Sequence, residues 1–258
     1  DQDIIKCGSY TGNGSTTGPT VDLGFEPQWL LIKDISTAQE NWQIFDQMRG
    51  MPVGGQPIHL YPNSSAAEGS VDNQFEITST GFKLTSVSNR TNASGRTYIY
   101  MAIRRGPLAE PTSATDVFAI DTQSQSSAPY AISNFPVDFA LRKDVDGSST
   151  DVHARLTQGQ GMFANSTSAE GSDNIAQFDY QNGYLDNTSQ DTTKYAWMWK
   201  RAPGYFDVVA YTGTGSGSKT INHNLGVVPE MMWVKSRGEV KNWRVYHKDL
   251  DATAPEDK

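Results

Sequence analysis

Short apolar runs alternate with polar, glycine-rich segments along the whole chain. The continuous run from Trp29 to Ile32 predicts a fully buried strand, whereas residues 41–45 alternate, with Trp42 and Ile44 on one side and Gln43 on the other. In residues 1–108 the pattern predicts strands at 4–10, 29–33, 41–45, 59–61, 75–77, 82–87 and 97–105. The best helical candidate, residues 45–50, could form one turn at most because Gly and Pro follow it. Many short strands separated by turn residues are typical of an all-β, antiparallel sandwich.

The segment at residues 21–33, Val-Asp-Leu-Gly-Phe-Glu-Pro-Gln-Trp-Leu-Leu-Ile-Lys, recurs at residues 225–235 as Leu-Gly-Val-Val-Pro-Glu-Met-Met-Trp-Val-Lys. A weaker middle copy stands at 135–143, and its later loop matches better: Asn-Ser-Ser-Ala-Ala-Glu-Gly-Ser at 63–70 returns as Asn-Ser-Thr-Ser-Ala-Glu-Gly-Ser at 165–172. The period is roughly one hundred residues, well beyond the roughly 20 to 50 of solenoid repeats, so each copy is a domain.

These boundaries predict a tandem-repeat organisation. Residues 1–108 form a first β-sandwich repeat, 109–115 a linker that carries Pro111, and 116–204 a divergent second repeat. Residues 205–258 form the first half of a third repeat, truncated before its later strands. Because half a sandwich cannot cover its own apolar face, we expect other residues or another chain to complete it.

Charge and composition narrow the class of protein. The net charge is −8, the pI is near 5.0 and the basic residues are scattered, which argues against a nucleic-acid partner and an anionic membrane surface. No apolar run approaches the roughly 20 residues that would span a bilayer. Cys7 is the single cysteine, so stability must come from packing rather than from an internal disulfide. The many Ser, Thr, Asn and Gly residues suit the loops of an extracellular or virion-surface protein.

Several motifs resemble a family of repeated domains of unknown function found in tail and virion proteins of bacteriophages. The resemblance rests on motifs that cover nearly the whole chain: Tyr-Thr-Gly-x-Gly at 10–14 and 211–215, Gly-Phe-x-Pro before an apolar strand and Lys at 24–33, Asn-Trp-x-Ile-Phe-Asp at 41–46, Ser-Thr-Gly-Phe-Lys-Leu at 79–84, and Asn-x-Ser-Gly-x-Thr-Tyr at 92–98. The second copy departs by lacking the Tyr-Thr-Gly-x-Gly opening. The resemblance implies a lectin-like, jelly-roll or concanavalin-like sandwich located in the virion, and supplies no catalytic residues.

Glu68 and Glu170 are the acidic residues that repeat in register within a matching loop. Glycoside hydrolysis needs two carboxylates at roughly 5 to 10 Å, and no second acid repeats with this pair. A structural role, in which the glutamate accepts hydrogen bonds from loop amides, is therefore favoured over catalysis. We predict no catalytic residues and no enzyme activity, and we keep both glutamates as candidate ligand-binding residues.

Candidate metal ligands are sparse. The four histidines occupy unrelated repeat positions without metal-ligand spacing, so no zinc site and no other cofactor is predicted. Asp144 and Asp146 begin a stretch that starts like a calcium loop, but it lacks the closing Glu at the twelfth position. A solvated turn is favoured there, with a loose calcium site as the alternative.

The six tryptophans could stack on sugar rings, but most lie inside apolar strands at repeated positions. Core packing is therefore the favoured interpretation of the tryptophans. An aromatic that binds a ligand is expected on a loop, and Tyr61 and Tyr130 are the candidates.

These observations lead to one functional hypothesis with three alternatives. The leading hypothesis is a non-catalytic bacteriophage virion protein, in a tail fibre or surface appendage, that contributes to contact with the host envelope. Expected partners are other virion proteins, further copies of the chain, for which a trimer is one arrangement, and a host surface glycan. The alternatives are a capsid or tail decoration protein without receptor binding, a polysaccharide depolymerase, and a cellular lectin-like adhesin. A contiguous apolar patch buried against partner subunits would favour decoration.

Overall fold

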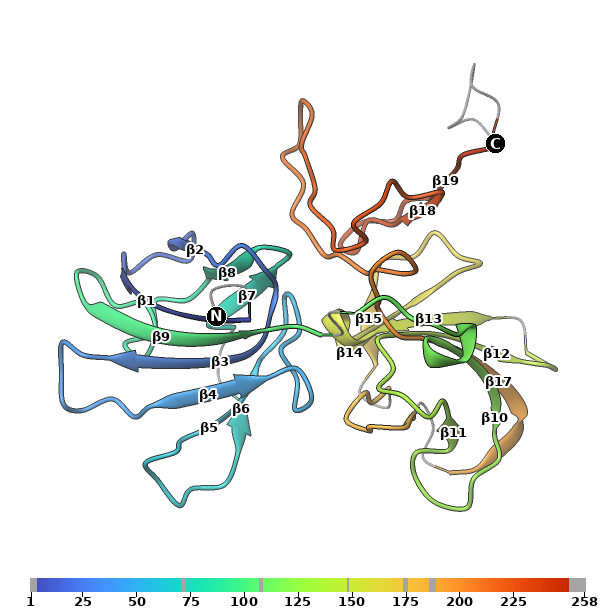
Figure 1. The fold of residues 1–258 in the computed structure, drawn as a ribbon, viewed down its shortest axis with the longest axis horizontal. Coiled ribbons are helices and arrows are strands. Elements are labelled where there is room, and N and C mark those ends of the chain that lie inside the picture. The colour runs from blue at the N-terminus through green and yellow to red at the C-terminus, as the bar shows by residue number, and fades with distance from the viewer. Residues whose placement is uncertain are drawn as a thin grey trace. The chain divides into compact units, whose positions relative to one another are not determined.

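The computed structural model describes residues 4–70, 73–106, 109–147, 149–173, 176–185 and 189–250. The chain divides into two compact units, coloured along the sequence in Figure 1. The first unit is Asp1–Leu108 with Arg155–Thr157 and Val209–His223, and the second is Ala109–Ala154 with Gln158–Val208 and Asn224–Lys258. In the described residues the helical elements are two short 3-10 turns, η1 (Ala114–Asp116) and η2 (Arg155–Thr157). The predicted all-β fold of tandem β-sandwiches is confirmed.

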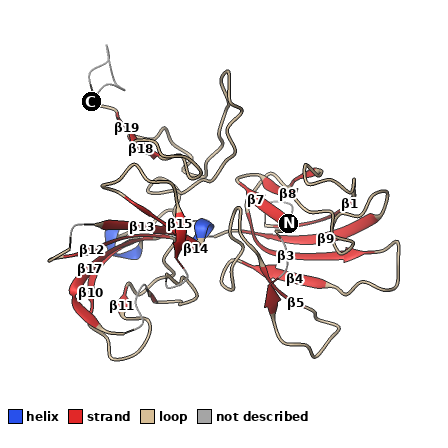
Figure 2. Cartoon of the chain, turned by 180° about the vertical axis from the view of Figure 1, so that it is seen from behind, coloured by secondary structure: helices blue, strands red, loops and turns tan. Residues whose placement is uncertain are grey.

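The first unit is built from two antiparallel sheets (Figure 2). The larger sheet has the order β1-β9-β3-β4-β5-β6, with β1 (Ile5–Thr11), β9 (Thr97–Arg104), β3 (Pro27–Asp34), β4 (Gln43–Asp46), β5 (Ile58–Leu60) and β6 (Gly69–Ser70). The smaller sheet has the order β2-β8-β7, with β2 (Thr20–Asp22), β8 (Gly81–Leu84) and β7 (Phe75–Thr78). The two sheets meet in an aromatic core, where the rings of Phe45 and Phe75 lie edge to face at 4.8 Å between centroids.

The prediction that the Trp29 run is fully buried is wrong. Leu30 and Ile32 are 0% exposed, but Trp29 and Leu31 are only half-buried because alternate residues of β3 point to opposite faces of the sheet. The predicted alternation around β4 is confirmed, with Gln43 and Phe45 buried and Trp42 and Ile44 on the outer side. The apolar run in β3 is continuous because both faces of that strand carry apolar side chains.

The second unit repeats the strand order of the first. Its larger sheet runs β10-β17-β12-β13-β14-β15, with β10 (Phe118–Gln123), β17 (Asp191–Trp199), β12 (Phe139–Asp144), β13 (Thr150–Ala154), β14 (Gly159–Phe163) and β15 (Gly171–Asp173). A two-stranded sheet pairs β11 (Ala131–Ile132) with β16 (Gly183–Tyr184). The buried core contains Ala131, Phe135, Val137, Ala140, Ala176, Phe178, Tyr184, Ala196 and Met198.

Among its described residues, the third copy supplies one hairpin, β18 (Met231–Val234) and β19 (Arg244–His247). Its register matches that of the first repeat: Met232 pairs with Tyr246 and Trp233 with Val245, as Leu30 pairs with Phe45 and Leu31 with Ile44. The repeat read from the sequence is therefore also a repeat of strand pairing.

The lysine that ends each copy of the apolar run donates hydrogen bonds to backbone carbonyls of the hairpin loop that follows it. The Lys33 ammonium donates to the carbonyl of Glu40 at 2.6 Å, and Lys143 donates to the carbonyl of Gly147, also at 2.6 Å. Lys235 donates to the carbonyls of Ser236 and Glu239 at 2.9 and 3.3 Å. A charge-assisted bond to loop carbonyls explains why a basic residue recurs at this position.

Candidate interaction surface

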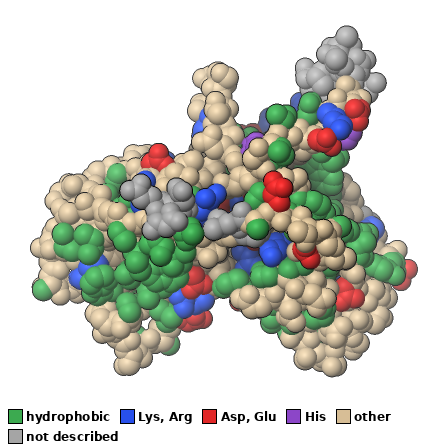
Figure 3. Space-filling view, viewed as in Figure 1, with side chains coloured by type: hydrophobic (Ala, Val, Ile, Leu, Met, Phe, Trp, Pro, Cys, Tyr) green, Lys and Arg blue, Asp and Glu red, His purple; other side chains and the backbone are tan. Residues whose placement is uncertain are grey.

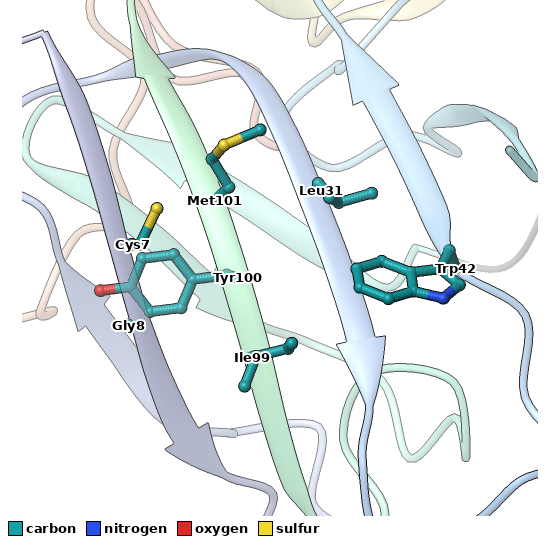
Figure 4. Close-up of a pocket in the computed structure, with 7 residues that line it drawn as sticks. All are labelled: Cys7, Gly8, Leu31, Trp42, Ile99, Tyr100 and Met101. Atoms are coloured by element: carbon teal, nitrogen blue, oxygen red, sulfur yellow. The ribbon is translucent and has the colours of Figure 1, made fainter.

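The outer face of the larger sheet in the first unit is apolar. One row of outward side chains crosses five paired strands: Cys7, Met101, Leu31, Ile44 and Leu60. Cys7 is exposed and the other members of the row are half-buried. In Figure 3 hydrophobic side chains gather over this sheet. A shallow hollow of about 320 Å³ in the sheet is lined by Cys7, Gly8, Leu31, Trp42, Ile99, Tyr100 and Met101 (Figure 4).

The second unit carries the same row at the same register. Its members are Ile120, Trp197, Leu141, Val152 and Met162. Ile120 is 56% exposed, Val152 is buried and the remaining three are half-buried. In the third copy the two equivalent positions are Trp233, 46% exposed, and Val245, 37% exposed. All three copies therefore have apolar side chains on the outer side of the hairpin, and of these Val152 alone is buried within the chain.

Such a face departs from the usual pattern of a β-sandwich, in which inward apolar residues alternate with outward polar ones. The second unit shows what an outer face of this kind can hold. The ring of Phe206, a residue that follows β17, stacks on Trp199 at 6.0 Å between centroids and lies 5.6 Å from the ring of Phe139. Contiguous exposed apolar patches mark interaction sites in soluble proteins.

The prediction that most of the tryptophans pack in the core is wrong. Trp29, Trp42, Trp197, Trp199 and Trp243 are half-buried, and Trp233 is exposed. The inner face is filled instead by smaller aromatic and aliphatic residues, because alternation in these strands places the indoles on the outer side. Sequence reasoning missed the outer row for the same reason: periodicity separates two faces without saying which one is covered.

The loop candidates of the first repeat lie after β5. Tyr61 is half-buried, with its ring 4.6 Å from that of His59 and the Arg90 guanidinium 6.0 Å from its centroid. Glu68 is exposed in the same loop, which Asn63 ties to the β4 hairpin by accepting from the backbone N–H of Trp42 at 3.1 Å. Burial lowers the pKa of His59, and the charges of Arg90 and Arg49 lower it further.

The loop candidates of the second repeat are separated. Tyr130 is half-buried beside β11, where its carbonyl accepts from the backbone N–H of Gln125 at 3.2 Å. Glu170 forms an ion pair with Arg237 at 2.7 Å, and its backbone N–H donates to the carbonyl of Arg237 at 2.8 Å. Glu170 thus joins the second repeat to the hairpin of the third, and the geometry gives it a structural role.

Asp144 is the last residue of β12, and Asp146 lies in the tight turn that follows it. The Asp144 carboxylate accepts from the backbone N–H of Asp146 at 3.1 Å. Lys143 donates to the carbonyls of Gly147 and Ser149 at 2.6 and 3.3 Å, so its ammonium group already bonds two carbonyl oxygens of this loop. Among the described residues, no group of three or more His, Cys, Asp and Glu side chains gathers to hold a metal ion.

A polar network that the sequence did not indicate surrounds the buried His153 in the second unit. His153 is 2% exposed and its Nε2 lies 2.7 Å from the carboxylate of Asp173. The Nδ1 of His153 is hydrogen-bonded to the hydroxyl of Tyr184, which is fully buried. By strand register His153 stands where Phe45 stands in the first unit, and Tyr184 matches Phe82, so the network replaces part of an aromatic core. Aligning the two copies by register would have found it.

Taken together, the geometry defines a tandem β-sandwich repeat protein with apolar outer sheet faces. A family model described as Domain of unknown function (DUF7483) matches residues 3–107 and 133–257, and the chain belongs to this family. No curated protein and no solved structure matches the chain. Of the helices in the described part of the chain, none is both long and apolar enough to cross a membrane.

Proposed function

We propose that this chain is a non-catalytic structural component of a bacteriophage particle, in a tail fibre or another surface appendage. Its repeats associate through the outer rows with further copies of the chain. The observation that carries this proposal is the apolar row, present in both complete units at the same register. The bacteriophage setting is supported by the resemblance of the sequence motifs to virion repeat domains.

Association through these rows has a physical basis. Burying apolar surface contributes roughly 25 cal/mol per Å², so a face repeated along a tandem chain adds its contribution once per repeat. Two or three copies aligned side by side would bring equivalent rows together, as closed symmetric oligomers require. The polar loops at the sheet ends stay free in such an arrangement and remain the place for contact with the host envelope.

Self-association of the purified chain tests the proposal. We expect sedimentation velocity to show a concentration-dependent oligomer for the wild type. Met101→Glu, which places a charge in the row, should raise the apparent dissociation constant at least about tenfold. Ser9→Glu is the matched control, because Ser9 is an exposed residue of the neighbouring strand on the same face and outside the row.

Two outcomes would redirect the assignment. A wild type that stays monomeric at the highest soluble concentration would refute self-association and favour the decoration alternative, in which the rows bind other virion proteins. Release of reducing ends from host envelope polysaccharide by the protein would refute the non-catalytic assignment. Blocked phage adsorption after pre-incubation of host cells with the protein would support envelope contact.

A further inference from the structure

The hairpin of the third copy has a strand edge whose counterpart is paired with another strand in both complete repeats. On the side away from their hairpin partners, β3 pairs with the closing strand β9 and β12 pairs with the closing strand β17. In the part of the chain that the structure describes, β18 pairs with β19 alone. The backbone groups along the other side of β18 therefore have no strand partner among these residues.

The inner face of this hairpin is also open. Met232, Val234 and Tyr246 are 44%, 41% and 37% exposed. Their equivalents in the first repeat, by pairing register, are Leu30, Ile32 and Phe45, and each of these is 0% exposed. A free strand edge beside uncovered apolar side chains is a template for pairing with another strand.

The hairpin is held in position against the second repeat, within the same unit. Trp243 donates through its indole N–H to the carbonyl of Phe163 at 2.9 Å, and the backbone N–H of Lys241 donates to the carbonyl of Thr167 at 2.9 Å. The Arg237–Glu170 ion pair adds a third contact. A preformed edge lowers the ordering cost of binding a strand.

We propose that the free edge of β18, with Met232, Val234 and Tyr246, is an acceptor site for an extended strand of the closing type. The occupant runs antiparallel to β18 and presents alternate apolar side chains to the inner face, as Tyr98, Tyr100 and Ala102 do in β9. Main-chain hydrogen bonds supply affinity, and the alternate side chains supply selectivity. This site is on the inner face of the hairpin and is separate from the outer row.

The test uses the full chain with a tethered strand. A Gly/Ser linker of about 20 residues, which spans on the order of 25 Å, joins the C-terminus to the sequence of Thr97–Arg104, Thr-Tyr-Ile-Tyr-Met-Ala-Ile-Arg. Tethering raises the effective concentration of the strand to the millimolar range. Hydrogen exchange followed by mass spectrometry then reports protection of the β18 amides. We expect exchange to slow at least about tenfold relative to the untethered chain.

Two controls isolate the inner face. A tether carrying Asp at the three alternating inner positions should give no protection. In the tethered protein, Met232→Asp should abolish protection, whereas Trp233→Asp, on the outer side of the same strand, should retain it. Unchanged exchange in the strands of the second repeat shows that both variants remain folded.

Two results would overturn the inference. The first is β18 exchange that the tether leaves unchanged. The second is protection in the untethered chain that rises with protein concentration, because it would show that a second copy occupies the edge. Loss of self-association in the Met101 variant has no bearing on this site, so the two proposals fail independently.

Discussion

Replacing Leu30 and Leu31 separately with alanine should separate the two faces of the larger sheet in the first unit. The residues are neighbours in β3 and the two substitutions remove the same atoms. Leu30 is 0% exposed and faces the smaller sheet, whereas Leu31 is half-buried in the outer row. Any difference between the two variants therefore reports the environment rather than the chemistry of the change.

The expected magnitudes follow from burial. Leu30→Ala loses the transfer free energy of the side chain and leaves a cavity, which together lower the free energy of unfolding by about 3 kcal/mol. Leu31→Ala loses only part of the transfer term, since water can occupy the space, and should lower it by about 1 kcal/mol. The difference of about 2 kcal/mol corresponds to roughly a 30-fold difference in the opening equilibrium.

Native-state hydrogen exchange of the β3 and β9 amides measures that opening in the full chain. It avoids assuming that two units unfold as one, which a single thermal midpoint would require. We expect exchange in β9, which pairs with β3, to accelerate far more in Leu30→Ala than in Leu31→Ala. Equal acceleration would mean that Leu31 is covered within the monomer, and the outer row would lose its status as a free surface.

Two further predictions concern charged groups. Asp207 is 4% exposed, accepts from the backbone N–H groups of Val208 and Asn224 and contacts the Arg201 guanidinium at 2.6 Å. Asp207→Ala should therefore lower the free energy of unfolding by about 3–5 kcal/mol, and Asp207→Asn by less. A decrease below about 1 kcal/mol in Asp207→Ala, measured by denaturant titration, would contradict this. Burial lowers the pKa of His59, so the unfolded state binds more protons than the folded state between the folded-state pKa and about 6.5. The first unit should therefore lose stability as the pH falls through about 6.5 toward the folded-state pKa. In His59→Gln this contribution should vanish, and parallel pH profiles of the two proteins below about 6.5 would argue against it.

Periodicity predicted the strands well where one face is buried. Of the strands predicted in the first repeat, those at 4–10, 59–61, 75–77 and 97–105 coincide with β1, β5, β7 and β9 to within one residue at each end. β2 escaped prediction because Thr20–Asp22 has three residues and a single buried side chain, Val21. It is a strand because β8 pairs with it, and such a long-range partner leaves no local signal.

The faces of the strands were harder to predict than the strands. In the segment around β4, Trp42 and Ile44 offer more apolar surface than Gln43 and Phe45, yet the second pair is buried. The choice is made by Phe75 from the other sheet, whose ring packs on Phe45. The ion pair between Glu170 and Arg237 likewise depends on contact between the second and third copies, so the residues of one loop do not predict it.

The inner and outer faces of the larger sheet differ in how much their residues change between the two complete repeats. Inside the sandwich, the paired residues Ile32 and Gln43 of the first unit give way to the ion pair of Arg142 and Asp151 in the second. A core accepts such a change when both partners change together, since an unpaired buried charge would be costly.

The outer row has remained apolar at all five positions in both units. A face that met only water would have no reason to keep side chains as large as Met101 and Trp197 while the core diverged. Retention of an apolar row on the outer face, beside replacement in the core, is therefore what a shared binding role for the outer faces predicts.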